Sequence, residues 1–564
     1  MLSSTIAVSP LKAQTTVPLP PPISPTPPPL PSPEDLLKPS PTPLPLPSPQ
    51  DLLTPSPQTP TNPEVPANTA PGTITVERFD VVGSTVFSKR KLDQVLAPFT
   101  KRPLSFAELL QARSAVTKLY NDEGYITTGA YIPPQPFQDG VVRIEVVEGT
   151  LEGINVTGTK RLNRNYVRSR IANATSKPLN VPRLLEALRL LQLNPLIKNV
   201  SAELSAGSRT GQNLLDVRVA EADTFSSPII LNNARSPSVG TFQRGVQINE
   251  ANLLGLGDSI SFAYKNTEGS NTYDASYILP INSANGTLGL SYSNASSNVI
   301  EAPFNLIDIE AASRYYDITL HQPIIQTPSK ELALGLRASR RESNTSLLGI
   351  PFPLSPGADE QGRTRISALR FFQDFTQRGN RQVFSARSEV SLGLDILNST
   401  INKTAPDSRF LAWRGQVQLA RLLAPETLLL LRGDVQLASR ALVPLEQFSL
   451  GGQESVRGYR QDALLTDNGA FASAEVRLPI YRTARQQGVL QLIPFVDVGT
   501  TWNSSGQDAP DPNTLASIGL GLQWQQGDRF KARLDYGIPL ISISSSDRTW
   551  QENGLYFSVI YNPF

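Results

Sequence analysis

Cysteine is absent from this chain of 564 residues, and histidine occurs once, at position 321. The lack of cysteine excludes disulfides, thiolate-bound zinc and thiol catalysis. A single histidine leaves almost no material for histidine metal sites or Ser/His/Asp triads. We therefore expect His321 to be an ordinary strand residue. We also expect no catalytic residues, no cofactor and no metal, so the composition gives no support for an enzyme.

Long apolar runs and a strong charge of one sign are also missing. No stretch of 18 apolar residues exists, which excludes a transmembrane helix. The net charge of +2 gives no basic signature for binding nucleic acid. Only 39% of the residues are hydrophobic, which is low for a large globular core. A β-barrel is still compatible with these values, because its short alternating segments barely raise the mean hydropathy.

Proline dominates the start of the chain, where residues 1–71 hold 23 of the 49 prolines. Such a segment builds neither a helix nor a sheet ladder, so we expect residues 1–72 to be a disordered, extended head. Residues 1–17 lack the basic start of a signal peptide and offer at most a remnant of one. The sequence SPEDLL at 32–37 recurs as SPQDLL at 48–53, which indicates either a duplicated linker or a pair of docking motifs.

Two units with the same order of elements, strand, helix, helix, strand, strand, are expected at residues 73–149 and 150–222. Ser105 and Glu108 form a capping box for the second helix of the first unit, and Asn180 caps the corresponding helix of the second. The predicted strands of the first unit are 74–82, 125–132 and 141–148, with helices at 89–99 and from Ser105 onward. The predicted strands of the second unit are 151–156, 198–204 and 213–220, with helices at 165–172 and from Asn180 onward.

Helical periodicity disappears after about residue 223, and short alternating segments separated by Gly, Asn, Asp and Ser recur to the end of the chain. One side of each segment is apolar, and the other is small, polar or charged, with recurring arginines. An outer-membrane barrel needs this pattern, because its outer face meets lipid and its lumen is wet. About 340 residues at roughly 20 per strand and connection predict about 16 strands. The expected fold is mostly β: a transmembrane antiparallel barrel at 223–564 behind two α+β units and the head.

A polar, glycine-bearing loop with the sequence SLGGQESVRGYR, residues 449–460, lies between two predicted strands at 428–437 and 470–478. A long loop between barrel strands can fold into the lumen, and an arginine placed there needs a carboxylate because an unpaired buried charge is costly. Asp497, which alternates with apolar residues in the segment FVDVG, is the nearest good candidate for Arg457. The two charges either pair or lie separately at the surface and in the lumen.

The two units, the barrel and these two motifs together resemble the two-partner secretion transporters, also called haemolysin secretion/activation proteins. In that family POTRA domains precede an outer-membrane barrel, and the loop lies inside the barrel with its arginine on the strand aspartate. The matching residues are Val456, Arg457, Gly458 and Tyr459 in the loop motif and Phe495, Asp497 and Gly499 in the strand motif. The resemblance implies that Arg457 pairs with Asp497, that Gly458 permits a tight turn and that Tyr459 packs beside it.

The resemblance implies a bacterial outer-membrane pore that recognises an unfolded partner exoprotein through periplasmic POTRA domains and secretes it through the barrel. Which POTRA residues bind the client is left open, and the units serve either for strand addition by the client or as rigid spacers. Further expected partners are outer-membrane lipid and the barrel assembly machinery, because the aromatic last strand ending in Phe564 resembles an assembly signal.

Two alternatives share parts of this pattern. An insertase for other barrels would use the same loop motif and open at a seam between residues 225–231 and the last strand. A passive porin would use the barrel as its pore and the two preceding units as a periplasmic anchor. Some members of the family carry an N-terminal helix that plugs the pore, and the proline-rich head offers no such helix.

Overall fold

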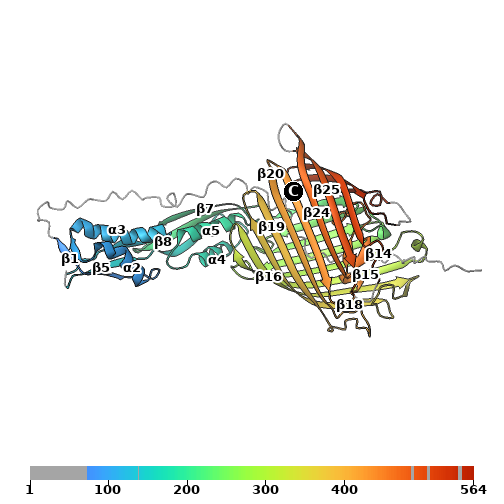
Figure 1. Ribbon diagram of the computed structural model, residues 1–564, viewed down its shortest axis with the longest axis horizontal. Coiled ribbons are helices and arrows are strands. Elements are labelled where there is room, and N and C mark those ends of the chain that lie inside the picture. The colour runs from blue at the N-terminus through green and yellow to red at the C-terminus, as the bar shows by residue number, and fades with distance from the viewer. Residues whose placement is uncertain (1–72, 137–138, 484–487, 505–507, 544–548) are drawn as a thin grey trace, which may run out of the picture.

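The computed structural model describes residues 73–136, 139–483, 488–504, 508–543 and 549–564. The proline-rich head predicted for residues 1–72, with its repeated hexapeptide, lies outside these ranges. Within them, two small α/β units lie end to end and lead into a wide barrel of strongly tilted strands (Figure 1).

The first unit is a three-stranded sheet in the order β2–β5–β4, packed against two helices around one apolar core. Its second helix begins at the predicted capping box, where the Glu108 amide donates to the Ser105 hydroxyl and the Glu108 carboxylate accepts from the Ser105 amide. The main elements are β2 (Arg78–Val82), α2 (Lys89–Leu96), η1 (Ala97–Phe99), α3 (Phe106–Asp122), β4 (Gly129–Tyr131) and β5 (Val141–Val147).

The first unit departs from the predicted strands in two places. The single strand predicted for 74–82 is broken at Glu77, whose amide donates to the Gly140 carbonyl at 2.8 Å. As a result β1 (Ile74–Val76) pairs with an unpredicted strand, β3 (Arg102–Leu104), while β2 runs parallel to β5. The strand predicted for 125–132 is shorter than expected, because a turn precedes Gly129.

The second unit repeats the architecture with a sheet in the order β6–β8–β7. Asn180 caps its second helix, with its side chain accepting from the Arg183 amide at 3.2 Å. The elements are β6 (Thr150–Thr157), α4 (Arg164–Ala174), α5 (Val181–Gln192), β7 (Ile197–Ala206) and β8 (Gln212–Glu221).

Among the described residues, none of the helices combines the length and the apolar run that crossing a bilayer would take.

Sixteen strands of the described chain form one closed antiparallel sheet, which confirms the predicted barrel. Two short strands, β9 (Phe225–Ser226) and β17 (Ile350–Pro351), are added to it. The sixteen are β10 (Ile229–Asn232), β11 (Gln243–Ala251), β12 (Ser259–Asn266), β13 (Ser270–Pro280), β14 (Thr287–Asn298), β15 (Ile309–Gln326), β16 (Lys330–Leu347), β18 (Arg363–Arg378), β19 (Gln382–Leu394), β20 (Leu411–Ala424), β21 (Thr427–Ala438), β24 (Asn468–Arg482), β25 (Gly488–Trp502), β26 (Thr514–Gln526), β27 (Phe530–Pro539) and β28 (Leu555–Tyr561).

The barrel is apolar outside and charged inside, the reverse of a soluble core. On β25, for example, Val496 and Val498 are 47% and 45% exposed, whereas Asp497 between them is fully buried. Because successive strand residues face opposite sides of a sheet, Asp497 points into the lumen and the two valines point outward. An outward apolar band of this kind suits contact with lipid.

The two ends of the barrel differ. The second unit packs against the turns that follow β11 and β13, where Arg161 contacts Glu250 at 2.8 Å and Arg170 contacts Asn285 at 2.7 Å. We call this the near end. The chain also finishes there, with the rings of Phe225 and Phe564 5.4 Å apart. The longest connections between barrel strands lie at the opposite, far end.

The barrel closes through a short seam between β10 and β28, which pair at four positions, whereas β15 and β16 pair at seventeen. Ile230 lies directly opposite Ile560, and opposed positions on antiparallel strands have Cβ atoms about 4.5–5.5 Å apart, within reach of a disulfide after slight adjustment.

We predict that the Ile230→Cys/Ile560→Cys variant forms an intramolecular disulfide in the membrane, detected as altered electrophoretic mobility that reductant reverses. The chain has no other cysteine to compete. The matched control is Ile230→Cys/Ser558→Cys, which is out of register by two residues. Equal cross-linking of both pairs would show that the seam is not fixed as described.

Candidate functional site in the barrel lumen

The connection between β21 and β24, residues 439–467, folds into the barrel, and we call it the lumen loop. It contains η4 (Pro444–Glu446) and a small hairpin of β22 (Phe448–Leu450) and β23 (Leu464–Thr466). Its apolar side chains Leu450, Val456 and Tyr459 are buried against the inward side chains of Phe471 and Leu515. The loop is therefore packed as a small core inside the lumen.

Arg457 is almost completely enclosed in the lumen, with 1% of its side chain exposed. Its Nε and Nη2 donate to the two carboxylate oxygens of Asp497 at 2.7 and 2.8 Å, and its backbone amide donates to the same carboxylate at 3.2 Å. The guanidinium also lies 3.5 Å above the centre of the Phe495 ring. A planar guanidinium bound in this two-pronged way is fixed in direction as well as in position.

The pair belongs to a larger network that the two motifs did not reveal. Nη1 of Arg457 donates to Glu475 on β24 at 3.0 Å, and Glu475 is in turn held by Arg477 at 2.8 Å and Arg533 at 3.0 Å. Asp535 on β27 closes the group through Arg533 at 2.7 Å. Three arginines therefore face three carboxylates, so the cluster is formally neutral although it is buried.

The glycine and tyrosine of the loop motif each meet a specific need. Gly458 has φ +100°, and a Cβ there would lie 3.2 Å from the Gly537 carbonyl of β27. Tyr459 places its hydroxyl 2.9 Å from the carbonyl oxygens of both Ala516 and Ile541. These contacts bind the loop motif to β26 and to the connection after β27.

The strand motif supplies the surface on which the loop rests. Phe495 and Asp497 contact Arg457 directly. A Cβ at Gly499 would lie 2.4 Å from the Leu450 side chain, so only glycine leaves room for the loop hairpin here. The seven motif residues are thus brought together at one wall of the lumen, formed by β24–β27.

A second charged contact ties the same loop to the opposite wall, and the sequence analysis missed it. Glu446 in η4 accepts from Arg341 on β16 at 2.8 Å and from Arg370 on β18 at 2.8 and 3.0 Å. All three side chains are at most 7% exposed. The lumen loop therefore spans the barrel, with Arg457 bound at one wall and Glu446 at the other.

Arg460 makes a third contact, towards the far-end connections. Its Nη2 lies 2.8 Å from Glu301, which follows β14, and its Nη1 lies 3.5 Å from Glu552, which precedes β28. The Arg460 side chain is 22% exposed, whereas Glu301 and Glu552 are 8% and 6% exposed, so this contact is enclosed on the carboxylate side.

A hollow of about 670 Å³ remains along the inner face of β12–β19. Two ion pairs line it, Lys265 with Asp274 at 3.0 Å and Arg387 with Asp374 at 2.6 Å. Arg235 and Asp317 also line it, and each has a buried polar atom without a hydrogen-bond partner among the described residues. His321, which we expected to be an ordinary strand residue, lies on β15 with its Nε2 3.6 Å from Asp374. This wall therefore presents charges of both signs, with cationic side chains in excess, to whatever occupies the lumen.

Comparison with known families identifies this architecture. Residues 211–524 match the family described as haemolysin secretion/activation protein ShlB/FhaC/HecB, and residues 74–149 match the ShlB-type POTRA domain. The chain belongs to the haemolysin secretion/activation family. It is therefore a secretion transporter of the outer membrane that works with a partner exoprotein, and its POTRA end, the near end of the barrel, lies in the periplasm.

Individual relatives in the family are distant but cover most of the chain. The heme/hemopexin transporter protein HuxB of Haemophilus influenzae (strain 86-028NP) is 21% identical over 80% of both chains. The outer membrane transporter CdiB of Escherichia coli (strain 536) is 23% identical over 85% of this chain and 81% of that one. A solved structure of CdiB from Escherichia coli has the same fold, with a TM-score of 0.68, 20% identity and 89% of this chain covered.

We predict that Arg457→Ala and Asp497→Ala each lower the free energy of unfolding by about 3–5 kcal/mol, because each leaves a buried charge without its main partner. The double variant should cost clearly less than the sum, since it removes both charges of one contact. Urea unfolding of the transporter in lipid vesicles measures all three values.

Glu454→Ala is the matched control, because this carboxylate of the same loop is 84% exposed, and we expect its loss to cost much less. Strictly additive losses in the Arg457/Asp497 cycle would contradict direct coupling of the two side chains.

Proposed function

We propose that the client polypeptide passes through the barrel along the inner face of β12–β19, while the Arg457 cluster holds the lumen loop against β24–β27. The observation that carries this proposal is the asymmetry of the lumen, which has a packed loop on one side and a hollow lined by charges of both signs on the other. A chain of mixed sequence can slide past a wall that carries both signs of charge, because the wall does not favour one type of residue alone.

We place the releasable contact at Glu446. The Arg457 cluster lies within one wall and involves three strands, so it can persist while the loop changes shape. The bonds from Glu446 to Arg341 and Arg370 cross to the wall along which the client would move. Their separation widens the hollow, and folding of the client outside the cell then makes its return unfavourable.

The second unit supplies a docking edge for the client. We propose that residues 150–222 form a second POTRA domain, after a first at 73–149 and before the barrel at 223–564. The order β6–β8–β7 leaves one edge of the ten-residue strand β7 without a strand partner among the described residues. An unfolded client can add a strand there through main-chain hydrogen bonds, whereas β4 at the edge of the first unit has three residues.

The transporter's own assembly involves lipid and the barrel assembly machinery in this proposal. The outward face is apolar, and β28 ends at Tyr561 at the periplasmic end, where the exposed Phe564 beyond it can be reached by an assembly factor. The four-pair seam beside β28 is the one feature that favours the alternative function, an insertase whose barrel opens sideways into lipid.

Locking the seam separates these two functions. We predict that the Ile230→Cys/Ile560→Cys variant secretes its exoprotein at the same rate when oxidised and when reduced, because transit occurs inside a closed barrel. Secretion is measured by appearance of the exoprotein in the medium, with the single-cysteine variants as controls. Secretion that stops on oxidation and resumes on reduction would refute transit through a closed lumen.

Removing the ionic contact of Glu446 with Arg341 and Arg370 tests the proposed path of the client. Glu446→Gln keeps the shape of the side chain but removes the charge that Arg341 and Arg370 share, and the two arginines then repel each other. We predict a larger single-channel conductance in planar bilayers, together with a folded barrel.

The control is Glu454→Gln, which changes the same charge in the same loop at a side chain that is 84% exposed. A conductance of Glu446→Gln equal to that of the control would contradict a role for Glu446 in narrowing the lumen.

A further inference from the structure

Four tyrosines lie on the outer face of the neighbouring strands β12–β15. They form two cross-strand pairs, Tyr264 with Tyr273 and Tyr292 with Tyr316, whose ring centres are 5.0 and 5.1 Å apart. Outward tyrosines are enriched at the boundary between the hydrocarbon layer and the headgroups. Residues one or two outward positions beyond the tyrosines therefore lie at the level of the headgroups of the outer leaflet.

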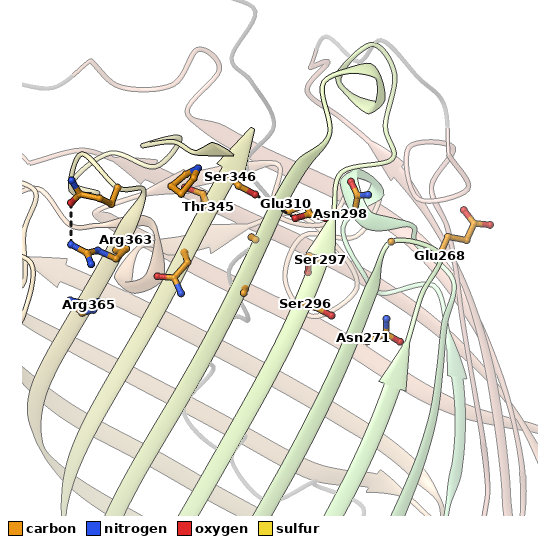
Figure 2. A pocket seen from close by; sticks show the side chains of 16 residues that line it. Glu268, Asn271, Ser296, Ser297, Asn298, Glu310, Thr345, Ser346, Arg363 and Arg365 are labelled. Carbon is orange, nitrogen blue, oxygen red and sulfur yellow. Dashed lines mark hydrogen bonds between the residues drawn. The ribbon is translucent and has the colours of Figure 1, made fainter. Parts of the chain in front are cut away.

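The strand registers place a row of mostly polar outward residues next to these tyrosines, on the side of the extracellular end. Asn271, Ser296, Ala312, Asn344 and Arg363 are opposite one another in turn across β13, β14, β15, β16 and β18. Ala312, in the middle of the row, has a small side chain, so the outer surface is depressed there. A hollow of about 720 Å³ results, in which Figure 2 shows Arg363 and Arg365 on one side and Asn271 and Ser296 on the other.

Arginines gather on the membrane side of the hollow. Arg314, Glu342 and Arg365 face one another across β15, β16 and β18, one outward position closer to the membrane than the row above. Arg340, opposite Tyr316, already bonds Glu342 at 3.1 Å. The side chains of Arg314 and Arg365 make no hydrogen bond or ion pair within the described ranges, so two guanidinium groups flank one carboxylate that is already engaged.

We propose that this hollow binds the phosphorylated sugar headgroup of an outer-leaflet glycolipid. Arg365 lines the hollow and Arg314 lies beside it, two strands away in the same cross-strand row, and both suit its phosphate because guanidinium groups bind phosphate oxygens in pairs. The amides and hydroxyls of Asn271, Ser296 and Asn344 suit the sugar hydroxyls. The acyl chains of the same lipid would lie on the apolar outer face, on the membrane side of the four tyrosines.

The acidic residues around the hollow are compatible with this ligand. Arg363 is paired with Asp359 at 2.8 Å, and Glu310 lies 3.5 Å from the Ser346 hydroxyl. A carboxylate beside a sugar accepts hydrogen bonds from hydroxyls, as Glu310 does from Ser346. The phosphate would contact Arg314 and Arg365, whose side chains have no partner among the described residues, rather than these carboxylates. The proposal rests on the outer-membrane location and not on the proposed path of the client.

The test is retention of lipopolysaccharide by the full-length transporter purified from outer membranes in mild detergent, measured by native mass spectrometry. The Arg314→Gln/Arg365→Gln variant should bind added lipopolysaccharide about tenfold or more weakly than the unchanged protein, since charge-assisted hydrogen bonds are lost. Ala312→Phe, which fills the hollow without changing charge, should weaken binding as well. Dephosphorylated lipopolysaccharide and phosphatidylglycerol should bind the unchanged protein as weakly as they bind the variants.

The matched control is Arg421→Gln, which removes an exposed arginine near the periplasmic end of β20 and should leave binding unchanged. Secretion and heat-modifiable mobility confirm that each variant is folded. Equal binding by all variants, or equal binding of dephosphorylated lipid, would overturn the proposal. Binding of the deacylated, phosphorylated saccharide as tight as that of the whole lipid would also overturn it, because the ligand would then be a soluble sugar.

Discussion

A guanidinium enclosed among carboxylates inside a lipid-facing cylinder is the interaction on which the arrangement of this lumen depends. Arg457 is nearly inaccessible, and a charge so placed is tolerable only with its partners in position. Asp497 and Glu475 provide those partners from two neighbouring strands. The lumen loop is consequently committed to one wall, and its apolar side chains complete a core that the wall alone does not have.

Because the lumen loop is packed against one wall, the lumen is divided into two unequal parts. The loop and its core fill the side formed by β24–β27, and a hollow lined by charges of both signs remains along β12–β19. Glu446 bridges the two parts through Arg341 and Arg370. Buried ion pairs add little net stability, but loss of one partner is costly. Such contacts suit a lumen loop that keeps one arrangement in the resting barrel and takes another while a client polypeptide passes.

The sequence predicted those features that follow from local pattern. Alternation and length predicted a barrel of about 16 strands, and the resemblance to a family placed Arg457 against Asp497. Glu446 escaped prediction because it lies in a short turn without a motif, and its partners are 105 and 76 residues away in the chain. The break at Glu77 was missed although the alternation changes phase there, from apolar residues at positions 74 and 76 to apolar residues at positions 79 and 81. The outer-face row of Asn271 to Arg363 depends on the register of five strands, which composition does not specify.

The most direct measurement is a cryo-electron microscopy structure of the transporter stalled with its client inside the barrel. The account predicts that the client lies along β12–β19, that Glu446 has left Arg341 and Arg370, and that Arg457 still binds Asp497. A client chain lying against β24–β27, with Arg457 separated from Asp497 and the lumen loop outside the barrel, would contradict it.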